Sequence, residues 1–180
     1  SQSQESVYAI SRAYSEASFR EVLEAAKMVG KISDLSAVIP YLESNLESVR
    51  FWGLIGIEAY VGDIEQVVPD LIRLLSDDAP AVAIKAAEIL IMREDHNAAY
   101  EVLKKMLLLE DEVQVLQAAI SVRRIGVKAR PFMPIITEEI FPEYSGEIWG
   151  RYKNWSYPMF IGMALDQAQI NCGIHVPTRK

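Results

Sequence analysis

Apolar residues recur along this chain at helical spacing, and the pattern as a whole repeats about every 32 residues. Three valines at separations of 33 and 31 residues each open the second helix of a predicted pair, namely Val49, Val82 and Val113. The first helix of each pair should end seven residues before that valine, at Leu42, Leu75 and Met106. A single pair of this length cannot bury its own apolar stripe, so neighbouring pairs must stack to form the core.

Apolar spacings of three and four residues, without sustained alternation of period two, predict helices almost throughout and no sheet. Ser18 begins a capping-box pattern, Gly30 and Gly126 are stop signals, and Pro40 should kink or delay a helix. Asp78 is the predicted N-cap of the helix that Pro80 opens. The predicted helices span residues 18–30, 35–42, 49–61, 67–75, 80–92, 97–108, 113–125, 131–140 and 155–170.

The predicted pairs share two further features. A short acidic turn joins the two helices of each pair, at Glu43-Ser44-Asn45, Ser76-Asp77-Asp78 and Glu110-Asp111-Glu112. Small residues lie at the centre of each second helix, where close packing needs them, at Gly53, Ala86-Ala87 and Ala118-Ala119. We therefore expect an all-α protein, an α-solenoid of four to five helix pairs with buried Leu75, Val82 and Leu90.

These helix pairs resemble HEAT-like repeats. Three segments look like the HEAT-like region that follows the catalytic domain in a group of bacterial sulfatases, Ser6–Arg12, Phe19–Ala26 and Ser48–Ile57. Residues 79–90 and 125–131 are also similar to that region, and the likeness covers residues 6 to about 135. Its most specific element is Val49-Arg50-Phe51-Trp52-Gly53.

The resemblance implies a non-catalytic module that docks on, or extends, the catalytic domain of a sulfatase within the same polypeptide. It also implies a periplasmic or extracellular location, because this family is commonly exported in bacteria. The alternative is a stand-alone HEAT-like scaffold or adaptor whose partner is another protein. Fold alone does not separate the two.

Residues 141–160 depart from the repeat, since seven of the 16 aromatic residues of the chain lie there. We expect a lead-in segment over 1–17, repeats over 18–140, and an aromatic-rich loop with a capping helix over 141–180. In the favoured interpretation the rings cover the open end of the last helix pair. In the other they form a contact surface for a partner domain or a sulfated carbohydrate, made by Trp149, Arg151, Tyr152, Lys153 and Trp155.

No catalytic residue, cofactor or metal is expected. Sulfatases as a family carry Cys- or Ser-x-Pro-x-Arg, whose first residue becomes a formylglycine, and carboxylates that hold calcium. Here Cys172 is followed by Gly173-Ile174-His175, and Cys172 with His175 supplies too few ligands for a metal site. His96 should be solvated or cap a helix at a turn. The carboxylate pairs should be helix caps or solvated, at Asp77-Asp78 and Glu138-Glu139.

The charge balance argues against a nucleic-acid partner. The chain has 25 acidic and 18 basic residues, a net charge of −7. A basic patch at Arg123, Arg124, Lys128 and Arg130 adjoins this acidic body, and we expect it to lie near a helix C-terminus. The longest charge-free stretch, residues 154–165, is shorter than the roughly 18 apolar residues of a membrane span, and the polar first residues predict no signal peptide.

Overall fold

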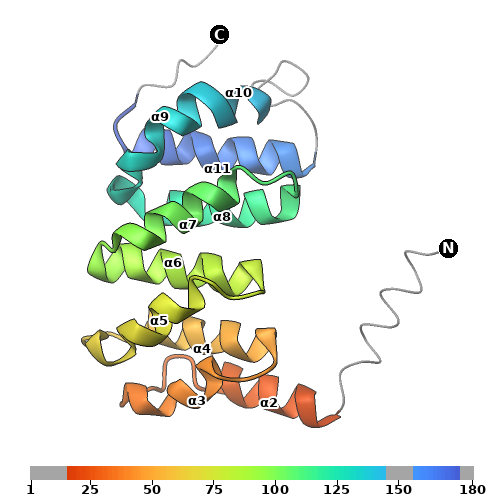
Figure 1. The fold of residues 1–180 in the computed structure, drawn as a ribbon, viewed down its shortest axis with the longest axis vertical. Helices are drawn as coiled ribbons and strands as arrows, with labels where there is room; N and C mark the ends of the chain where they lie inside the picture. The colour runs from red at the N-terminus through yellow and green to blue at the C-terminus, as the bar shows by residue number, and fades with distance from the viewer. Residues whose placement is uncertain (1–15, 145–155, 175–180) are drawn as a thin grey trace, which may run out of the picture. The chain divides into compact units, whose positions relative to one another are not determined.

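The computed structural model describes residues 16–144 and 156–174, and every regular element within these ranges is helical. The predicted all-α class is confirmed for this part of the chain (Figure 1). Among the described helices, none combines the length and the apolar composition that a membrane span requires. The chain divides into two compact units, residues 1–67 and 68–180, with the boundary inside the predicted repeat region.

The first unit is built on one long helix. Helix α4 (Glu47–Ala59) packs against α2 (Glu16–Lys27) and the short α3 (Ile39–Leu42). Two 3₁₀ turns complete the unit, η1 (Leu35–Ala37) and η2 (Glu65–Val67), and contact each other. The core consists of apolar side chains from all of these elements, including Ala25, Leu35, Val38, Leu42, Val49, Leu54, Ile57 and Val67.

The second unit starts with four helices in succession, α5 (Val68–Leu74), α6 (Pro80–Glu94), α7 (Asn97–Leu107) and α8 (Glu112–Arg124). Helix α6 contacts α5, α7 and α8, so the second helices of two successive predicted pairs lie side by side. The four predicted alanines at the centre of these helices are fully buried, at positions 86, 87, 118 and 119. The last described helix, α11 (Tyr157–Asn171), makes its largest contact with α8.

An irregular helical segment connects α8 to α10. It consists of the 3₁₀ turn η3 (Gly126–Phe132), α9 (Met133–Ile135), the π-helical turn η4 (Ile136–Ile140) and α10 (Phe141–Tyr144). Proline lacks a backbone N–H, and Pro131, Pro134 and Pro142 therefore interrupt the regular hydrogen-bond ladder in this stretch. The predicted helix over 131–140 is present, but as this mixed segment.

Most predicted starts and stops are within two residues of the observed helix ends. Gly30 and Gly126 adopt the left-handed conformation, with φ of 74° and 61°, just after α2 and α8. Pro40 lies in the first turn of α3, so it delays that helix as expected. Two predicted caps are wrong. Ser18 lies inside α2, and the N-cap of α6 is Ala79, which has an extended backbone just before Pro80. The carboxylate that bonds near this helix start is that of Asp77, which accepts the Ala79 N–H at 2.9 Å.

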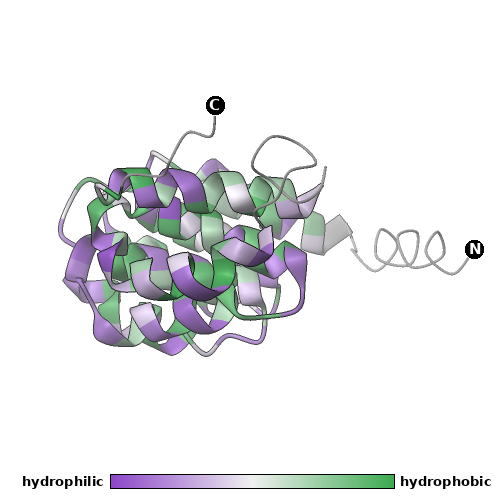
Figure 2. Cartoon of the chain, turned by 90° about the horizontal axis from the view of Figure 1, so that it is seen from above, coloured by the Kyte–Doolittle hydropathy of each residue, from purple (hydrophilic) through white to green (hydrophobic). Residues whose placement is uncertain are grey.

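The predicted core positions Leu75, Val82 and Leu90 are buried, which confirms the inward face of the middle pair. Hydrophobic and hydrophilic residues alternate around the helices accordingly (Figure 2). The third copy differs from the prediction, since Val113 is 44% exposed while Val115 is fully buried. The equivalent buried valines are therefore 49, 82 and 115, and both separations become 33 residues.

Candidate functional site

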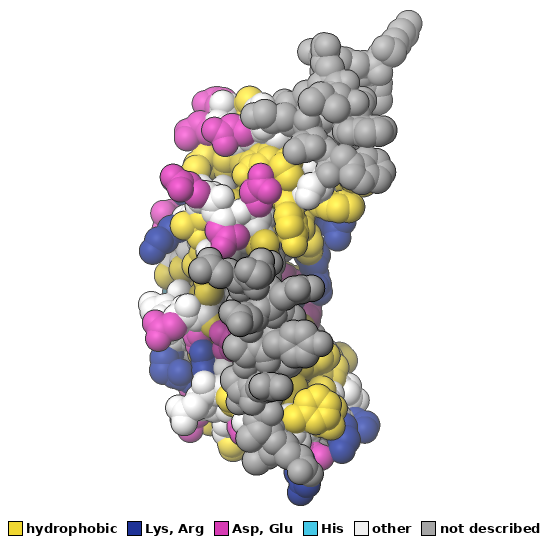
Figure 3. All heavy atoms as spheres, turned by 90° about the vertical axis from the view of Figure 1, so that its right-hand side faces the viewer, with side chains coloured by type: hydrophobic (Ala, Val, Ile, Leu, Met, Phe, Trp, Pro, Cys, Tyr) yellow, Lys and Arg dark blue, Asp and Glu magenta, His cyan; other side chains and the backbone are white. Residues whose placement is uncertain are grey.

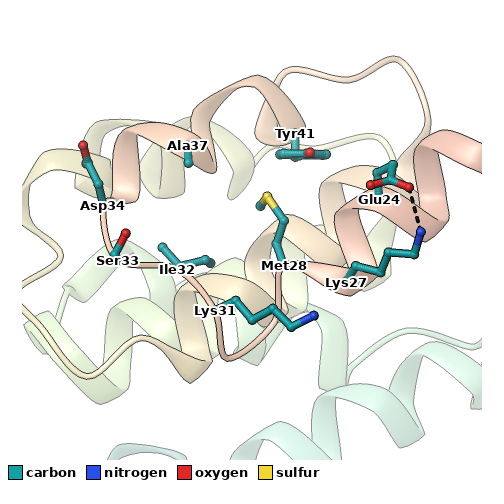
Figure 4. A pocket seen from close by; sticks show the side chains of 9 residues that line it. All are labelled: Glu24, Lys27, Met28, Lys31, Ile32, Ser33, Asp34, Ala37 and Tyr41. Atoms are coloured by element: carbon teal, nitrogen blue, oxygen red, sulfur yellow. Dashed lines mark hydrogen bonds and ion pairs between the residues drawn. The ribbon is translucent and has the colours of Figure 1, made fainter.

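A pocket of about 330 Å³ opens on the surface of the first unit (Figure 4). The end of α2, the turn that follows it, η1 and α3 supply its lining residues, which are Glu24, Lys27, Met28, Lys31, Ile32, Ser33, Asp34, Ala37 and Tyr41. Met28 lies at the centre of the view and points toward the ring of Tyr41. The pocket therefore combines an apolar middle with a rim that carries both signs of charge.

The two carboxylates of the pocket are held in their ionised form. Lys27 donates to Glu24 at 2.8 Å, and this hydrogen bond together with the lysine charge lowers the pKa of Glu24. The backbone N–H and side chain of Ser36 lower the pKa of Asp34, whose Oδ1 accepts that N–H at 2.9 Å. A carboxyl group that is ionised at neutral pH cannot donate a proton as a general acid. No histidine lies in the lining, so Ser33 has no imidazole base there.

Two glycines of α4 set the position of the pocket wall. A Cβ at Gly53 would lie 3.0 Å from Cδ2 of Leu42 and 3.3 Å from Cβ of Tyr41. A Cβ at Gly56 would lie 2.7 Å from Cδ1 of Ile32. Tyr41 and Ile32 both line the pocket, and they can approach α4 this closely only because the glycines lack side chains. The two glycines, which lie three residues apart in α4, thus serve close packing.

A buried polar cluster joins α6 and α8 in the second unit. Glu88 is only 1% exposed, and its Oε1 accepts from Lys85 Nζ at 3.1 Å and Arg124 Nε at 3.0 Å. Its Oε2 accepts the hydroxyl of Ser121 at 2.5 Å. Three donors therefore satisfy one buried carboxylate, which offsets the cost of removing it from water.

The sequence prediction missed this cluster, although one signal was present. Lys85 and Glu88 are the only charged residues between Val82 and Met92 of α6, and they stand three residues apart on an otherwise apolar helix. Such a spacing permits an ion pair on one helical face. The partner residues on α8 carry no comparable signal, because Ser121 and Arg124 resemble ordinary surface residues.

Two residues of the predicted basic patch form an ion pair or hydrogen bonds with other residues of the second unit. Arg124 pairs with Glu88, and Lys128 donates to the carbonyl oxygens of Ile91 and Met92 at 2.8 and 3.2 Å. These carbonyls belong to the last turns of α6, where a cation is favourable. Lys128 therefore lies at a helix C-terminus as expected, while the side chains of Arg123 and Arg130 are exposed.

The turn between α6 and α7 contains the predicted His96, which is the N-cap residue of α7. Its Nδ1 is buried without a hydrogen-bond partner. The preceding residue, Asp95, has a left-handed backbone with φ of 53° and accepts the Tyr100 hydroxyl at 2.6 Å. Burial and this negative partner raise the pKa of Tyr100. His96 thus occupies the expected turn.

The acidic turns act mainly as helix caps. Asp111 accepts the backbone N–H groups of Val113 and Gln114 at 2.9 and 3.4 Å, as an N-cap residue should. Asp77 plays the related role already described before α6. In the first copy Ser44 replaces the carboxylate and accepts the Leu46 N–H at 3.2 Å. The other predicted carboxylate pair, at residues 138 and 139, is exposed.

The predicted contact residues Trp149, Arg151, Tyr152, Lys153 and Trp155 lie outside the described residues. Of the four described rings from the aromatic segment, Phe141 and Tyr144 are half-buried, whereas Tyr157 and Phe160 are exposed. The predicted cap would bury these rings, but Tyr157 and Phe160 are exposed. Helix α11 packs on α8 and α10 with other sides.

Cys172 is buried at the end of α11, and its thiol lies 3.7 Å from the carbonyl oxygen of Gly126. Burial raises the pKa of this thiol, and the charge of Arg130 partly opposes that effect. His175 lies outside the described residues. Within the described ranges, His, Cys, Asp and Glu form no group of three or more that could hold a metal ion.

The described fold defines the class of the chain, an all-α protein of packed helices with a charged pocket and a buried ionic cluster. Comparison with protein-family models, curated proteins and solved structures found no match. The likeness to a sulfatase-associated HEAT-like region therefore stays a prediction from the sequence.

Proposed function

We propose that this chain is a helical-repeat module of the HEAT-like, α-solenoid type that acts by binding another protein and performs no reaction of its own. The observation that carries the proposal is the common register of α4, α6 and α8. At a constant spacing of 33 residues, three sets of positions are buried in all three helices, namely 49/82/115, 53/86/119 and 56/89/122. Buried positions that recur at one spacing in several helices are typical of repeat proteins, which usually function by presenting a binding surface.

The placement of the polar groups supports a binding role. The carboxylates of the pocket are ionised and therefore do not act as general acids, and the buried Glu88 accepts from three donors of its own unit. A small recess with an apolar middle and charges of both signs on its rim suits a polypeptide partner, whose side chains offer the same mixture.

For the partner we propose the catalytic domain of a sulfatase, within the same polypeptide. The support is the resemblance carried by Val49-Arg50-Phe51-Trp52-Gly53 and its neighbouring segments. In this arrangement the sulfatase domain supplies the reaction and any calcium or formylglycine, while the present chain supplies a docking surface. A stand-alone scaffold is the competing arrangement.

The absence of catalysis can be tested with 4-nitrophenyl sulfate. We expect the 180-residue chain to release 4-nitrophenolate no faster than buffer, while an active formylglycine sulfatase run in parallel turns over. Hydrolysis that persists through purification and is abolished by Cys172→Ser, or by any other substitution in this chain, would contradict the proposal. Hydrolysis unchanged by all such substitutions would indicate contamination.

The partner can be tested by reading the genomic frame 5′ of the Ser1 codon. A sulfatase catalytic sequence in that frame supports the assignment, and a frame without one favours the scaffold. The encoded catalytic domain is then titrated with this chain by calorimetry. Lys31→Glu, which reverses a charge at the pocket, should weaken binding by about tenfold, whereas the matched control Lys104→Glu on an exposed part of α7 should not. Equal affinity of the two variants for the catalytic domain would show that the pocket is not part of the contact.

A further inference from the structure

Helix α11 has one exposed apolar stripe. One side of the helix is buried against the rest of the second unit, and its residues include Pro158, Ile161, Leu165 and Ala168. The exposed stripe runs at spacings of three and four residues along the remaining side. We call it the α11 stripe, and its large apolar members are 44, 51, 47 and 54% exposed, namely Tyr157, Phe160, Met163 and Ile170. The exposed Gln167, a neutral residue, lies between the last two and donates to the side chain of Asn171 at 3.0 Å.

The α11 stripe carries no charge. Asp166 is the only charged residue of the helix, and it is buried. An exposed row of large apolar side chains costs free energy in water unless protein covers it. The stripe therefore has the composition of a contact face, and charged residues of the described chain flank its two ends.

Basic side chains of the described residues lie around the C-terminal end of α11. The side-chain amide of Asn171 donates to the carbonyl oxygen of Arg123 at 3.1 Å, so the C-terminal ends of α8 and α11 lie together. The Cys172 thiol contacts Gly126 at the same end. Arg123 and Arg130 both have exposed side chains. Helices α8 and α11 thus run parallel, and the end of both is positively charged.

At the N-terminal end of α11, the charged groups that the described residues supply are acidic. Because α8 and α11 are parallel, the acidic turn that precedes α8 lies toward the start of α11. Helix α10, which packs on α11, contributes the exposed Glu143. Glu143 and Glu112 both act electrostatically on Tyr144, so each of these carboxylates lies near that residue of α10. Figure 3 shows acidic side chains gathered over this part of the second unit.

We propose that the α11 stripe binds the α11 stripe of a second copy of this chain, with the two helices antiparallel across a twofold axis. A neutral apolar stripe is self-complementary, as an isologous interface requires. The antiparallel arrangement places the acidic end of each copy against the basic end of the other. A parallel arrangement would instead juxtapose like charges, which disfavours it.

The size of the stripe sets the strength of the dimer. Four large side chains that are each about half exposed offer on the order of 400 Å² per copy. Stable complexes bury roughly 800 Å² per partner, so we expect a reversible monomer–dimer equilibrium with Kd of about 10–100 µM. This dimer requires only the second unit, and it would form whether or not the chain docks on a sulfatase.

Sedimentation velocity on the 180-residue chain, over about 1–300 µM, tests the proposal by mass action. We expect the weight-average mass to rise toward twice the monomer value. Phe160→Glu should weaken dimerisation by about 30-fold or more, because it places two like charges in the paired stripes. The matched control is Leu108→Glu on an equally exposed apolar residue outside the stripe (52% against 51%), and it should dimerise normally.

A charge swap tests the antiparallel orientation. Arg123→Glu and Glu143→Lys should each weaken the homodimer by roughly three- to tenfold, since each creates two like-charge contacts. An equimolar mixture of the two variants should dimerise as well as the unmodified chain, because both contacts of the mixed dimer then pair opposite charges. A mixture no better than its components would overturn the antiparallel arrangement.

Circular dichroism of each variant separates loss of association from loss of folding. If the chain is monomeric at all concentrations, the proposal is wrong. If it is monomeric and Phe160→Glu also lowers the melting temperature, another part of the same chain covers the stripe. If Phe160→Glu and Leu108→Glu weaken association equally, copies associate through a different surface, and the proposal is again overturned.

Discussion

At the residue scale, Glu88 shows how a buried charge is retained in an apolar helix. Its two oxygens accept from Lys85 of the same helix and from Ser121 and Arg124 of α8, and the last two tie α6 to α8. The Ser121–Glu88 contact spans 33 residues, the same separation as that of the buried valines 49, 82 and 115. We interpret the cluster as a device that specifies the register of α6 against α8, since only one alignment satisfies all three donors.

We predict that Glu88→Gln lowers the free energy of unfolding by about 3 kcal/mol, because the buried Lys85 loses its charged acceptor. Ser121→Ala should cost only about 1 kcal/mol, the usual value of one neutral donor. Urea unfolding followed by circular dichroism measures both. The double substitution Lys85→Met with Glu88→Leu should recover most of the loss, and a Glu88→Gln variant as stable as the unmodified chain would contradict the proposed role.

A second residue-scale prediction concerns Cys172. Its raised pKa lowers the fraction of thiolate at any given pH, and the thiolate is the reactive form. Native protein at pH 8 should therefore react with 5,5′-dithiobis(2-nitrobenzoate) at least about tenfold more slowly than protein in urea. Arg130→Gln should slow the native reaction further, because it removes the charge that favours the thiolate. Equal native and unfolded rates would show that the thiol is accessible and unperturbed.

At the element scale, the close approach of α3 and the preceding turn to α4 depends on two glycines that do not make equal contacts. Gly53 faces the buried Leu42 and the Cβ of Tyr41, and neither can withdraw easily. Gly56 faces only the terminal methyl of Ile32, which is part of a flexible side chain. The two positions therefore offer a matched comparison within one helix.

We predict that Gly53→Ala destabilises the chain by about 1 kcal/mol, since overpacking of roughly 2 kcal/mol exceeds the helix-propensity gain of about 1 kcal/mol. Gly56→Ala should be within about 0.5 kcal/mol of neutral, because Ile32 can rotate away. Thermal unfolding of both variants measures the difference. A Gly53→Ala chain more stable than Gly56→Ala would show that α3 is not held against α4 as described.

At the scale of the whole molecule, the division into two units predicts separable folding. The second unit has its own core, with buried side chains from successive helices such as Leu90, Leu103, Val122 and Leu165. A fragment of residues 68–180 should therefore keep a helical spectrum and unfold cooperatively. Differential scanning calorimetry on the fragment checks this, and a fragment without a heat-absorption peak would show that the unit cannot fold alone.

Several features followed directly from the order of the residues. Helical spacing, prolines near helix starts and glycines after helix ends located almost every described helix, because these signals act within a few residues of chain. A recurring spacing was visible as well, since the separation of 33 residues between Val49 and Val82 is also that between two buried valines of α6 and α8. The buried alanines of α6 and α8 could also be predicted from the sequence, because closely packed helices need small residues at their contact.

Other features required the tertiary structure. An apolar stripe on a helix is broad, so Val113 and Val115 are both acceptable inward residues until packing places the second in the core. The partners of Glu88 on α8, Ser121 and Arg124, lie 33 and 36 residues away, a separation over which no local signal reports contact. The pocket likewise depends on segments that are distant in sequence, since Ile32 and Tyr41 pack against α4. The α11 stripe is exposed because α8 covers a different side of that helix. Local propensity determines which residues form helices, whereas the competition of neighbouring helices for the same apolar surface decides which faces remain free.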